Sequence, residues 1–220
     1  QLLNFSIDLG LFVSNFSFFF DELETNNILL TPHWANLDPL ENKGSIIDVL
    51  RGGLYNAGFI GANKKGTEAI SWWAEMCHYK IEKNPALGLS DDQKYLDILP
   101  AQFPNVKILK HQGCNLASWN VQTCKREIIN GKLLVNQQFE PIFIHFAKET
   151  IVNIINRNDK LLHPYLEEYI QLLKKEGKNR RSITKPIINK EHRKLSKSRA
   201  YALGVMCGDG CVFSGTEHKG

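Results

Sequence analysis

Short apolar runs alternate along the chain with longer stretches in which apolar residues recur every three or four positions. The longer stretches predict amphipathic helices over 16–24 and 68–83, and two further helices within 149–176 that are divided at Asn158-Asp159. The short runs predict buried strands over 5–13, 28–31, 54–62, 106–109 and 142–146. Because strands alternate with helices, the pattern predicts an α/β body.

Polar and turn-forming residues mark several element ends. Thr67 is placed to cap the second predicted helix, and Pro100 is expected to end a further helix that begins at Asp92. Asn130 and Gly131 lie between two apolar runs, which predicts a tight β-hairpin.

The strand predicted over 54–62 contains two glycines and one amide. Glycine inside a strand leaves side-chain space unfilled, so Gly58 and Gly61 indicate close approach of a ligand or of another backbone. Asn56 offers both hydrogen-bond donors and acceptors at that opening. The strand is therefore a candidate wall of a pocket for a polar small molecule.

Other candidates have plain structural alternatives. His33 follows a predicted strand, where open α/β sheets collect ligands, although a histidine in this setting is more often packed. Asp91 and Asp92 open a predicted helix, where the helix dipole alone favours acids. The Trp72-Trp73 pair is better explained by core packing than as a stacking platform for a sugar.

Basic residues are concentrated near the end of the chain. The segment 174–199 holds eleven Lys or Arg against two acids, whereas the rest has sixteen against twenty-one, within a net charge of +4. Any affinity for nucleic acid is therefore expected in the tail. Because few residues of 178–197 are apolar, the sequence predicts a flexible linker there.

Five cysteines occur without a Cys-x-x-Cys pair, which favours a reducing, cytoplasmic setting. Cys207, Cys211 and His218 are a weak candidate for a zinc site, because the usual spacings of structural zinc ligands are absent. No targeting segment is recognised, and the most apolar run, 9–20, is shorter than the roughly 20 residues of a membrane span.

Several stretches, taken together, resemble a bacterial family of nucleotide-sugar glycosyltransferases of the GT-A type. Their order and spacing match over about residues 5–150. The resemblance implies a Rossmann-like sheet that binds a nucleoside diphosphate sugar and transfers the sugar to an acceptor hydroxyl. The stretches are Ser6-Ile7-Asp8-Leu9-Gly10, Leu30-Thr31-Pro32-His33, Gly53-Leu54-Tyr55-Asn56-Ala57-Gly58-Phe59-Ile60-Gly61, Trp72-Trp73, Asp92-Gln93-Lys94-Tyr95-Leu96-Asp97, Asn115-Leu116-Ala117-Ser118-Trp119-Asn120 and Ile144-His145-Phe146.

The same resemblance assigns roles to individual residues. Asp92 is the implied catalytic residue, which positions a hydroxyl or steers the nucleophile, and Asn56 faces the donor sugar with it. The substrate-binding residues that the resemblance implies are His33, Asn56, Gly58, Gln93, Asn115 and Trp119.

A divalent cation, Mn²⁺ or Mg²⁺, is implied on the diphosphate, where it would ease departure of the leaving group. Its implied ligands are Asp8 and His145. The family has an Asp-x-Asp at this point, and Gly10 replaces the second Asp, which weakens the metal site.

The family also has two or three strand-helix units before this motif, whereas this chain starts only a few residues ahead of Asp8. We therefore expect a partial GT-A fold over 1–176, a fragment that does not turn over by itself. A non-catalytic α/β scaffold is the alternative that the missing Asp favours.

The end of the chain resembles a different class of protein. The stretch from Leu195 to Val212 resembles the start of a LAGLIDADG homing endonuclease domain, with Asp209 as the metal-binding acid. The domains predicted are thus 1–176, a linker over 177–197, and a truncated nuclease-like piece, a short helix and strand, over 198–220. An intein or homing endonuclease is the alternative function, and DNA is a partner only if that domain is complete.

Overall fold

The computed structural model describes residues 3–7, 10–175 and 187–188, which form a mixed α/β structure with small sheets. Asp8, most of the expected linker and the whole nuclease-like piece, including Asp209, lie outside the described residues.

A helix or strand is present in each stretch where the apolar pattern predicts one, with short 3₁₀ turns between several of the elements. The strands are β1 (Leu3–Ile7), β2 (Gly10–Phe12), β3 (Ile28–Pro32), β4 (Tyr55–Asn63), β5 (Lys83–Asn84), β6 (Leu89–Ser90), β7 (Val106–Ile108), β8 (Arg126–Ile129), β9 (Lys132–Val135), β10 (Phe143–His145) and β11 (Ile187–Ile188). The helices are α1 (Phe18–Thr25), α2 (Lys43–Gly52), α3 (Thr67–Tyr79), α4 (Leu99–Gln102), α5 (Lys148–Ile155) and α6 (His163–Lys175). The 3₁₀ turns are η1 (Lys64–Gly66), η2 (Pro85–Leu87), η3 (Gln93–Ile98), η4 (Ser118–Asn120) and η5 (Lys160–Leu162).

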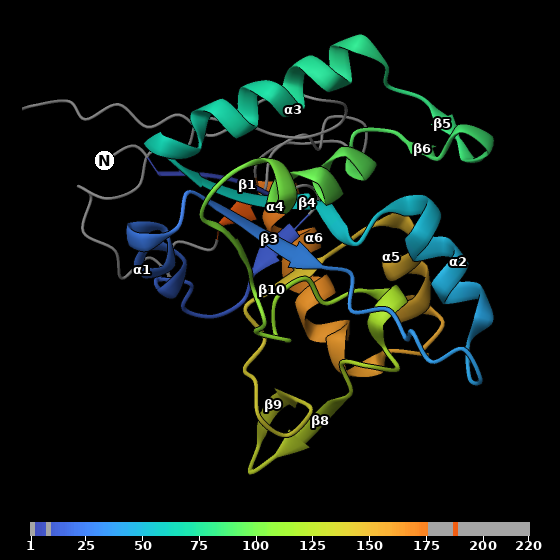
Figure 1. The fold of residues 1–220 in the computed structure, drawn as a ribbon. Coiled ribbons are helices and arrows are strands. Elements are labelled where there is room, and N and C mark those ends of the chain that lie inside the picture. The colour runs from blue at the N-terminus through green and yellow to red at the C-terminus, as the bar shows by residue number, and fades with distance from the viewer. Residues whose placement is uncertain (1–2, 8–9, 176–186, 189–220) are drawn as a thin grey trace, which may run out of the picture.

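A four-stranded sheet in the order β1-β4-β3-β7 forms the upper part of the body in Figure 1, and α3 lies across it. Neighbouring strands within this sheet are antiparallel, except that β3 and β7 are parallel. Side chains alternate between its two faces. Ile28, Leu30 and Ile60 pack in the cluster that includes Trp73 of α3, whereas Leu29 packs in the opposite cluster.

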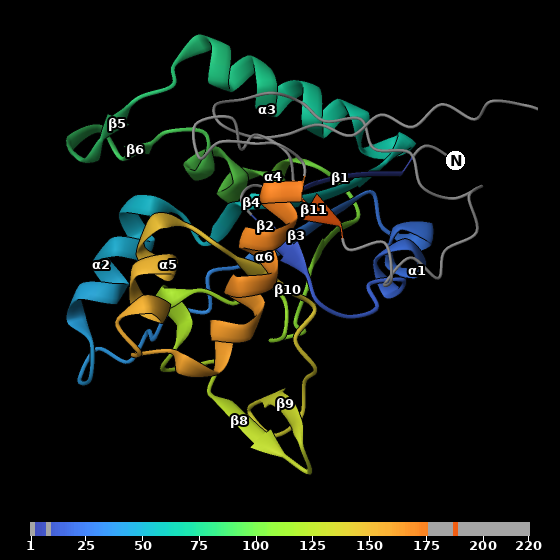
Figure 2. The ribbon, with the colours of Figure 1, turned by 180° about the vertical axis from the view of Figure 1, so that it is seen from behind.

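A phenylalanine-rich cluster fills the space between this sheet and a second sheet of order β10-β2-β11. Phe12, Phe19, Phe59 and Phe143 belong to it, and the rings of Phe59 and Phe143 lie 5.0 Å apart. Helix α6 covers the second sheet and faces the viewer in Figure 2.

Strands β3 and β4 change register where the glycine-containing segment begins. Leu30 pairs with Ile60, but Pro32 pairs with Tyr55. Proline has no N–H to donate, and such bulges concentrate beside functional sites because they re-aim side chains. The bulge thus lies within the strand that the sequence marked as a pocket wall.

The single strand predicted over 5–13 is wrong, because β1 and β2 belong to different sheets. Ile7 pairs with Phe59 of β4, whereas Gly10 pairs with His145 of β10. An apolar run records burial but not the partner of each strand, so periodicity could not detect this division.

Three further boundaries differ from the predictions. Residues 93–98 form the 3₁₀ turn η3, and Pro100 lies in the first turn of α4. The N–H groups of a first helical turn have no acceptor within the helix, so proline is tolerated there. Pro100 therefore does not end a helix. The helix after Thr67 ends at Tyr79 rather than at residue 83.

The β8–β9 hairpin is confirmed, and so is the division of 149–176 into two helices. The predicted linker is wrong at Ile187–Ile188, which pair with β2 as β11. Within the described part of the chain, no helix combines the length and apolarity that a membrane crossing requires.

Candidate functional site

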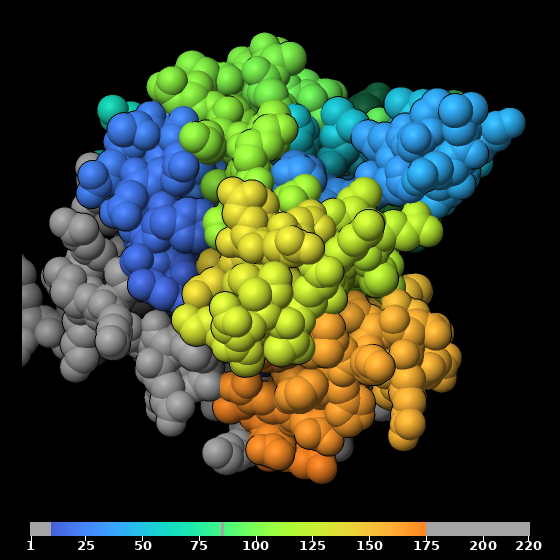
Figure 3. Space-filling view, turned by 90° about the horizontal axis from the view of Figure 1, so that it is seen from below, coloured from blue at the N-terminus to red at the C-terminus, as the bar shows by residue number. Residues whose placement is uncertain are grey.

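A cavity of about 690 Å³ opens between α2, η4 and the region of α5. Figure 3 shows this region from below. Helix α2, in light blue, projects at one side of the yellow-green segment that precedes the β8–β9 hairpin, and α5 and α6, in orange, lie next to that segment. The lining residues are His33, Ala35, Asn42, Ser45, Asp48, Val49, Gly52, Gly53, Gln93, Ser118, Trp119, Val121, Gln122, Asn153 and Asn158.

Three of the residues that the resemblance implied, His33, Gln93 and Trp119, form what we call the inner wall. Gln93 is held at both ends of its amide, since its Oε1 accepts from Ala57 N–H at 3.2 Å and its Nε2 donates to the Gly52 carbonyl at 2.8 Å. These bonds join η3 to β4 and to the end of α2. The inner wall is therefore preorganised without a ligand.

Asn56 lies behind the inner wall and is only 4% exposed. Its Oδ1 accepts from Gly58 N–H at 2.7 Å, so its Nδ2 is the atom that faces His33 Nε2 at 3.2 Å. His33 Nε2 must then act as the acceptor, which places the ring proton on Nδ1. Burial lowers the pKa of His33, in agreement with a neutral ring.

Gly58 owes its identity to His145. A Cβ at position 58 would lie 2.2 Å from His145 Cε1 and 2.6 Å from Asn56 Oδ1. The space that the sequence attributed to a ligand or backbone is thus filled by an imidazole. Burial, with a smaller effect of His33, lowers the pKa of His145 to about 4, and its ring meets Trp119 at a centroid distance of 5.2 Å.

The described residues do not by themselves complete a metal site. They contain no group of three or more His, Cys, Asp or Glu side chains placed to hold an ion. His145 Nδ1 is buried and lies 2.5 Å from where a Cβ at position 58 would stand, so this nitrogen faces backbone rather than open space. The metal predicted at Asp8 and His145 therefore depends on Asp8, which lies outside the described residues.

Asn115 and Asn120 shape the loop that presents Trp119. Asn120 Nδ2 donates to the carbonyls of His33 at 3.2 Å and Asn115 at 2.8 Å, and its Oδ1 accepts from Ala117 N–H at 3.1 Å. Asn115 is fully buried at a φ of +64°, a conformation that asparagine tolerates well. Asn115 is thus placed behind the cavity rather than in its lining.

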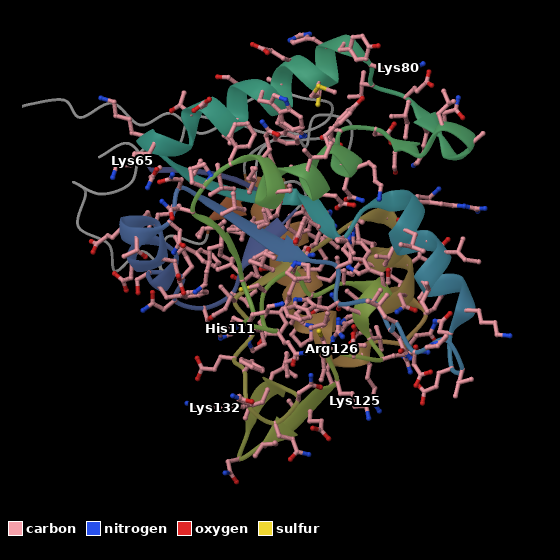
Figure 4. The ribbon with its side chains drawn as sticks, in the orientation of Figure 1. Lys65, Lys80, His111, Lys125, Arg126 and Lys132 are labelled. Atoms are coloured by element: carbon pink, nitrogen blue, oxygen red, sulfur yellow. The ribbon has the colours of Figure 1, made fainter. Side chains whose placement is uncertain are left out.

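Arg126 holds the same loop from below, where it lies at the base of the β8–β9 hairpin near Lys125 (Figure 4). Its guanidinium donates to Asn120 Oδ1 at 2.9 Å and to the Ala117 carbonyl at 2.8 Å. Its Nε lies 3.3 Å from Asp159 Oδ2, and the two side chains are 2% and 5% exposed. We call the connected set His33, Asn56, Asn115, Asn120, Arg126 and His145 the polar junction.

Asp92 does not line the cavity. It is half-buried, and its backbone carbonyl accepts from Trp73 Nε1 at 2.9 Å. The neighbouring Gln93 reaches the lining instead.

Six other polar lining residues, which we call the outer wall, were not predicted as site residues. Helix α2 contributes Asn42, Ser45 and Asp48, and the region beyond η4 contributes Gln122, Asn153 and Asn158. Asn42 is the N-cap of α2, and its Oδ1 accepts from Ser45 N–H at 3.1 Å. No sequence signal identifies these polar residues, because they are separated along the chain and typical of loops and exposed helix faces.

Comparison with known proteins gives two curated relatives from Bacillus subtilis strain 168. One, described as "Uncharacterized protein YfnF", is 31% identical over 126 residues, which are 54% of this chain and 42% of the relative. The other, "Uncharacterized protein YfnD", is 32% identical over 106 residues, which are 46% of this chain and 34% of the relative. The chain thus spans less than half the length of either relative. No family model and no solved structure match.

Proposed function

We propose that the chain contributes the sugar-binding part of a glycosyltransferase of the GT-A type, which transfers a sugar from a nucleoside diphosphate sugar to an acceptor hydroxyl. The observation that carries the proposal is the inner wall. His33, Gln93 and Trp119 come from three separate stretches of the resemblance and meet in one cavity of about 690 Å³. Ligand sites are commonly concave and lined by a few convergent polar groups.

Buried polar atoms beside this wall support the proposal. His33 Nδ1, Asn115 Oδ1, Trp119 Nε1 and His145 Nδ1 have no hydrogen-bond partner among the described residues. Such atoms are uncommon and each needs a structural or functional reason. His33 Nδ1 and Trp119 Nε1 belong to the inner wall, and Asn115 Oδ1 and His145 Nδ1 lie behind it, a concentration that favours a built site over a plain scaffold.

The roles proposed differ in their support. Gln93 and Trp119 contact the sugar directly, whereas Asn56, Gly58 and Asn115 position the wall from behind. Asp92 stays the proposed catalytic carboxylate, and a divalent cation held by Asp8 and His145 would stabilise the departing diphosphate.

The test uses the parent protein that includes the segment upstream of this chain. We expect release of nucleoside diphosphate from a nucleotide sugar when Mn²⁺ or Mg²⁺ is present. Asp92→Asn should abolish turnover, and Asp91→Asn should retain it, because the Asp91 side chain is 48% exposed and pairs with Lys83. Equal turnover in both variants would remove Asp92 from the mechanism, and the absence of metal-dependent release would overturn the function.

A further inference from the structure

The lining of the cavity is unusual in its charge. Of its fifteen residues, none is Lys or Arg, and Asp48 is the one carboxylate. Asn42, Gln93, Gln122, Asn153 and Asn158 supply five amides. Within the described part of the chain, the lining therefore offers many neutral donors and acceptors but no cation for a phosphate.

Most of these outer-wall groups keep hydrogen-bonding capacity. Among the described residues, Asn42 uses only its Oδ1, and the side chains of Asn153 and Asn158 form no hydrogen bond. Asp48 is exposed on α2 and has no ion pair within the described part of the chain. These groups face the cavity with free donors on the amides and a free acceptor on Asp48.

Trp119 adds an apolar surface to this polar lining. Its indole is half-buried, and it is the one ring besides the imidazole of His33 among the lining residues. A pyranose presents hydroxyls at its rim and C–H groups on its faces, so amides, one carboxylate and an indole match both parts. A diphosphate would instead meet Asp48 and find no counter-charge.

We propose that the outer wall is an acceptor site that takes an uncharged, hydroxyl-rich saccharide and excludes anions. Asp48 accepts hydrogen bonds from saccharide hydroxyls, while the amides of Asn153 and Asn158 bind the remaining hydroxyls. The inference rests on the proposed function, because it names the substrate that the transferase would glycosylate. The nucleoside diphosphate binds outside this wall.

The test observes the side-chain amide signals of the five lining Asn and Gln residues by NMR in the chain as it stands. The probes, at tens of millimolar, are neutral methyl glycosides of glucose, galactose, mannose and rhamnose, with glucose 1-phosphate, uridine and pyrophosphate beside them. At least one glycoside should shift the signals of Asn153 and Asn158, and the anionic probes should leave them unchanged.

Two variants sharpen the result. Asp48→Asn keeps the shape of the side chain but removes its charge, so glycoside affinity should fall by about tenfold and discrimination against glucose 1-phosphate should shrink. Asp21→Asn on α1 is the matched control, because Asp21 is exposed and lies outside the lining, and it should bind as the unaltered chain does.

The outcomes separate this inference from the function it rests on. If glycosides shift the outer wall but the parent protein transfers no sugar, the saccharide site stands and the transferase proposal falls. If no glycoside shifts these signals, or if only uridine or an anionic probe does, the acceptor assignment is overturned while the transferase proposal is untouched.

Discussion

Two buried regions are held by different forces. One is the polar junction, and the other is the apolar layer between α3 and the four-stranded sheet, which contains Leu30, Ile60 and Trp73. In the layer, Leu30, Ile60 and Trp73 remove apolar surface from water, which is non-directional and tolerates small shifts. In the polar junction, the amides, the imidazole of His33 and the guanidinium of Arg126 form hydrogen bonds with specific partners, whereas the imidazole of His145 is held by packing against Gly58 and Trp119. The first arrangement stabilises the body, whereas the second determines the geometry of the inner wall.

The largest effect is expected at Arg126. Arg126→Met leaves Asp159 as an unpaired buried carboxylate and frees the loop carbonyls, so the free energy of unfolding should fall by about 3–5 kcal/mol. Urea unfolding measures the loss, and the amide signals of the cavity should shift.

The control for that variant is Lys125→Met on the exposed neighbouring position, which should change stability by less than about 0.5 kcal/mol. If Arg126→Met and Lys125→Met unfolded at the same urea concentration, the buried ion pair of Arg126 would not stabilise the fold. The proposed difference between the polar junction and the apolar layer would then be wrong.

Leu30→Ala tests the layer. Leu30 is fully buried, so the truncation should lower the free energy of unfolding by about 2–5 kcal/mol. Unlike Arg126→Met, it should leave the amide signals of the cavity in place, because Leu30 faces α3. If those signals moved in Leu30→Ala, the two regions would be coupled rather than distinct.

The two histidines make the polar junction sensitive to acid. Since burial lowers the pKa of His145 to about 4 from 6.5, the unfolded chain binds its proton first as the pH falls. The neutral His145 side chain therefore contributes its full stabilisation to the free energy of unfolding above pH 6.5. This contribution is lost as the pH falls from 6.5 to 4, and the loss at pH 5 is about 2 kcal/mol. His33 acts in the same direction.

Unfolding of the unaltered chain and of His145→Gln at pH 7 and pH 5 measures this effect, and the variant should lose less stability between the two values. Ile144→Val on the same strand is the control, with a loss of about 1 kcal/mol at both pH values. Equal pH dependence in His145→Gln and the unaltered chain would contradict the assignment.

The smallest effect is expected in the hairpin. Gly131 has a φ of +77°, and nothing lies within 4 Å of the position of a Cβ there. Gly131→Ala should therefore cost about 1 kcal/mol from backbone strain alone, with no change at the cavity. Asn130→Gly, at a φ of +52°, is the control that relieves the same type of strain. A loss at Gly131 well above the strain cost would indicate side-chain contacts that the structure does not show.

Much of the fold could be predicted because apolar runs, turn residues and short motifs indicate burial and backbone conformation locally. The buried strand that contains Leu29 and Leu30, the hairpin turn at Asn130 and the cavity residues Gln93 and Trp119 all carry local or motif-level signals. The division between β1 and β2 and the 3₁₀ turn before Pro100 could not be read in this way, because strand partners and helix type depend on distant segments.

The residue pattern alone predicted an α/β body and a glycine-containing strand suited to close approach, and the resemblance named three residues that line a polar cavity. The three-dimensional contacts were needed to show that His145 fills the space beside Gly58, that Arg126 holds the loop of Trp119, and that Asp48 lines the same cavity as Trp119. The physical reason is that hydrogen bonds and charge pairs here join residues far apart along the chain. Their energies depend on distance and orientation, which composition and periodicity do not contain.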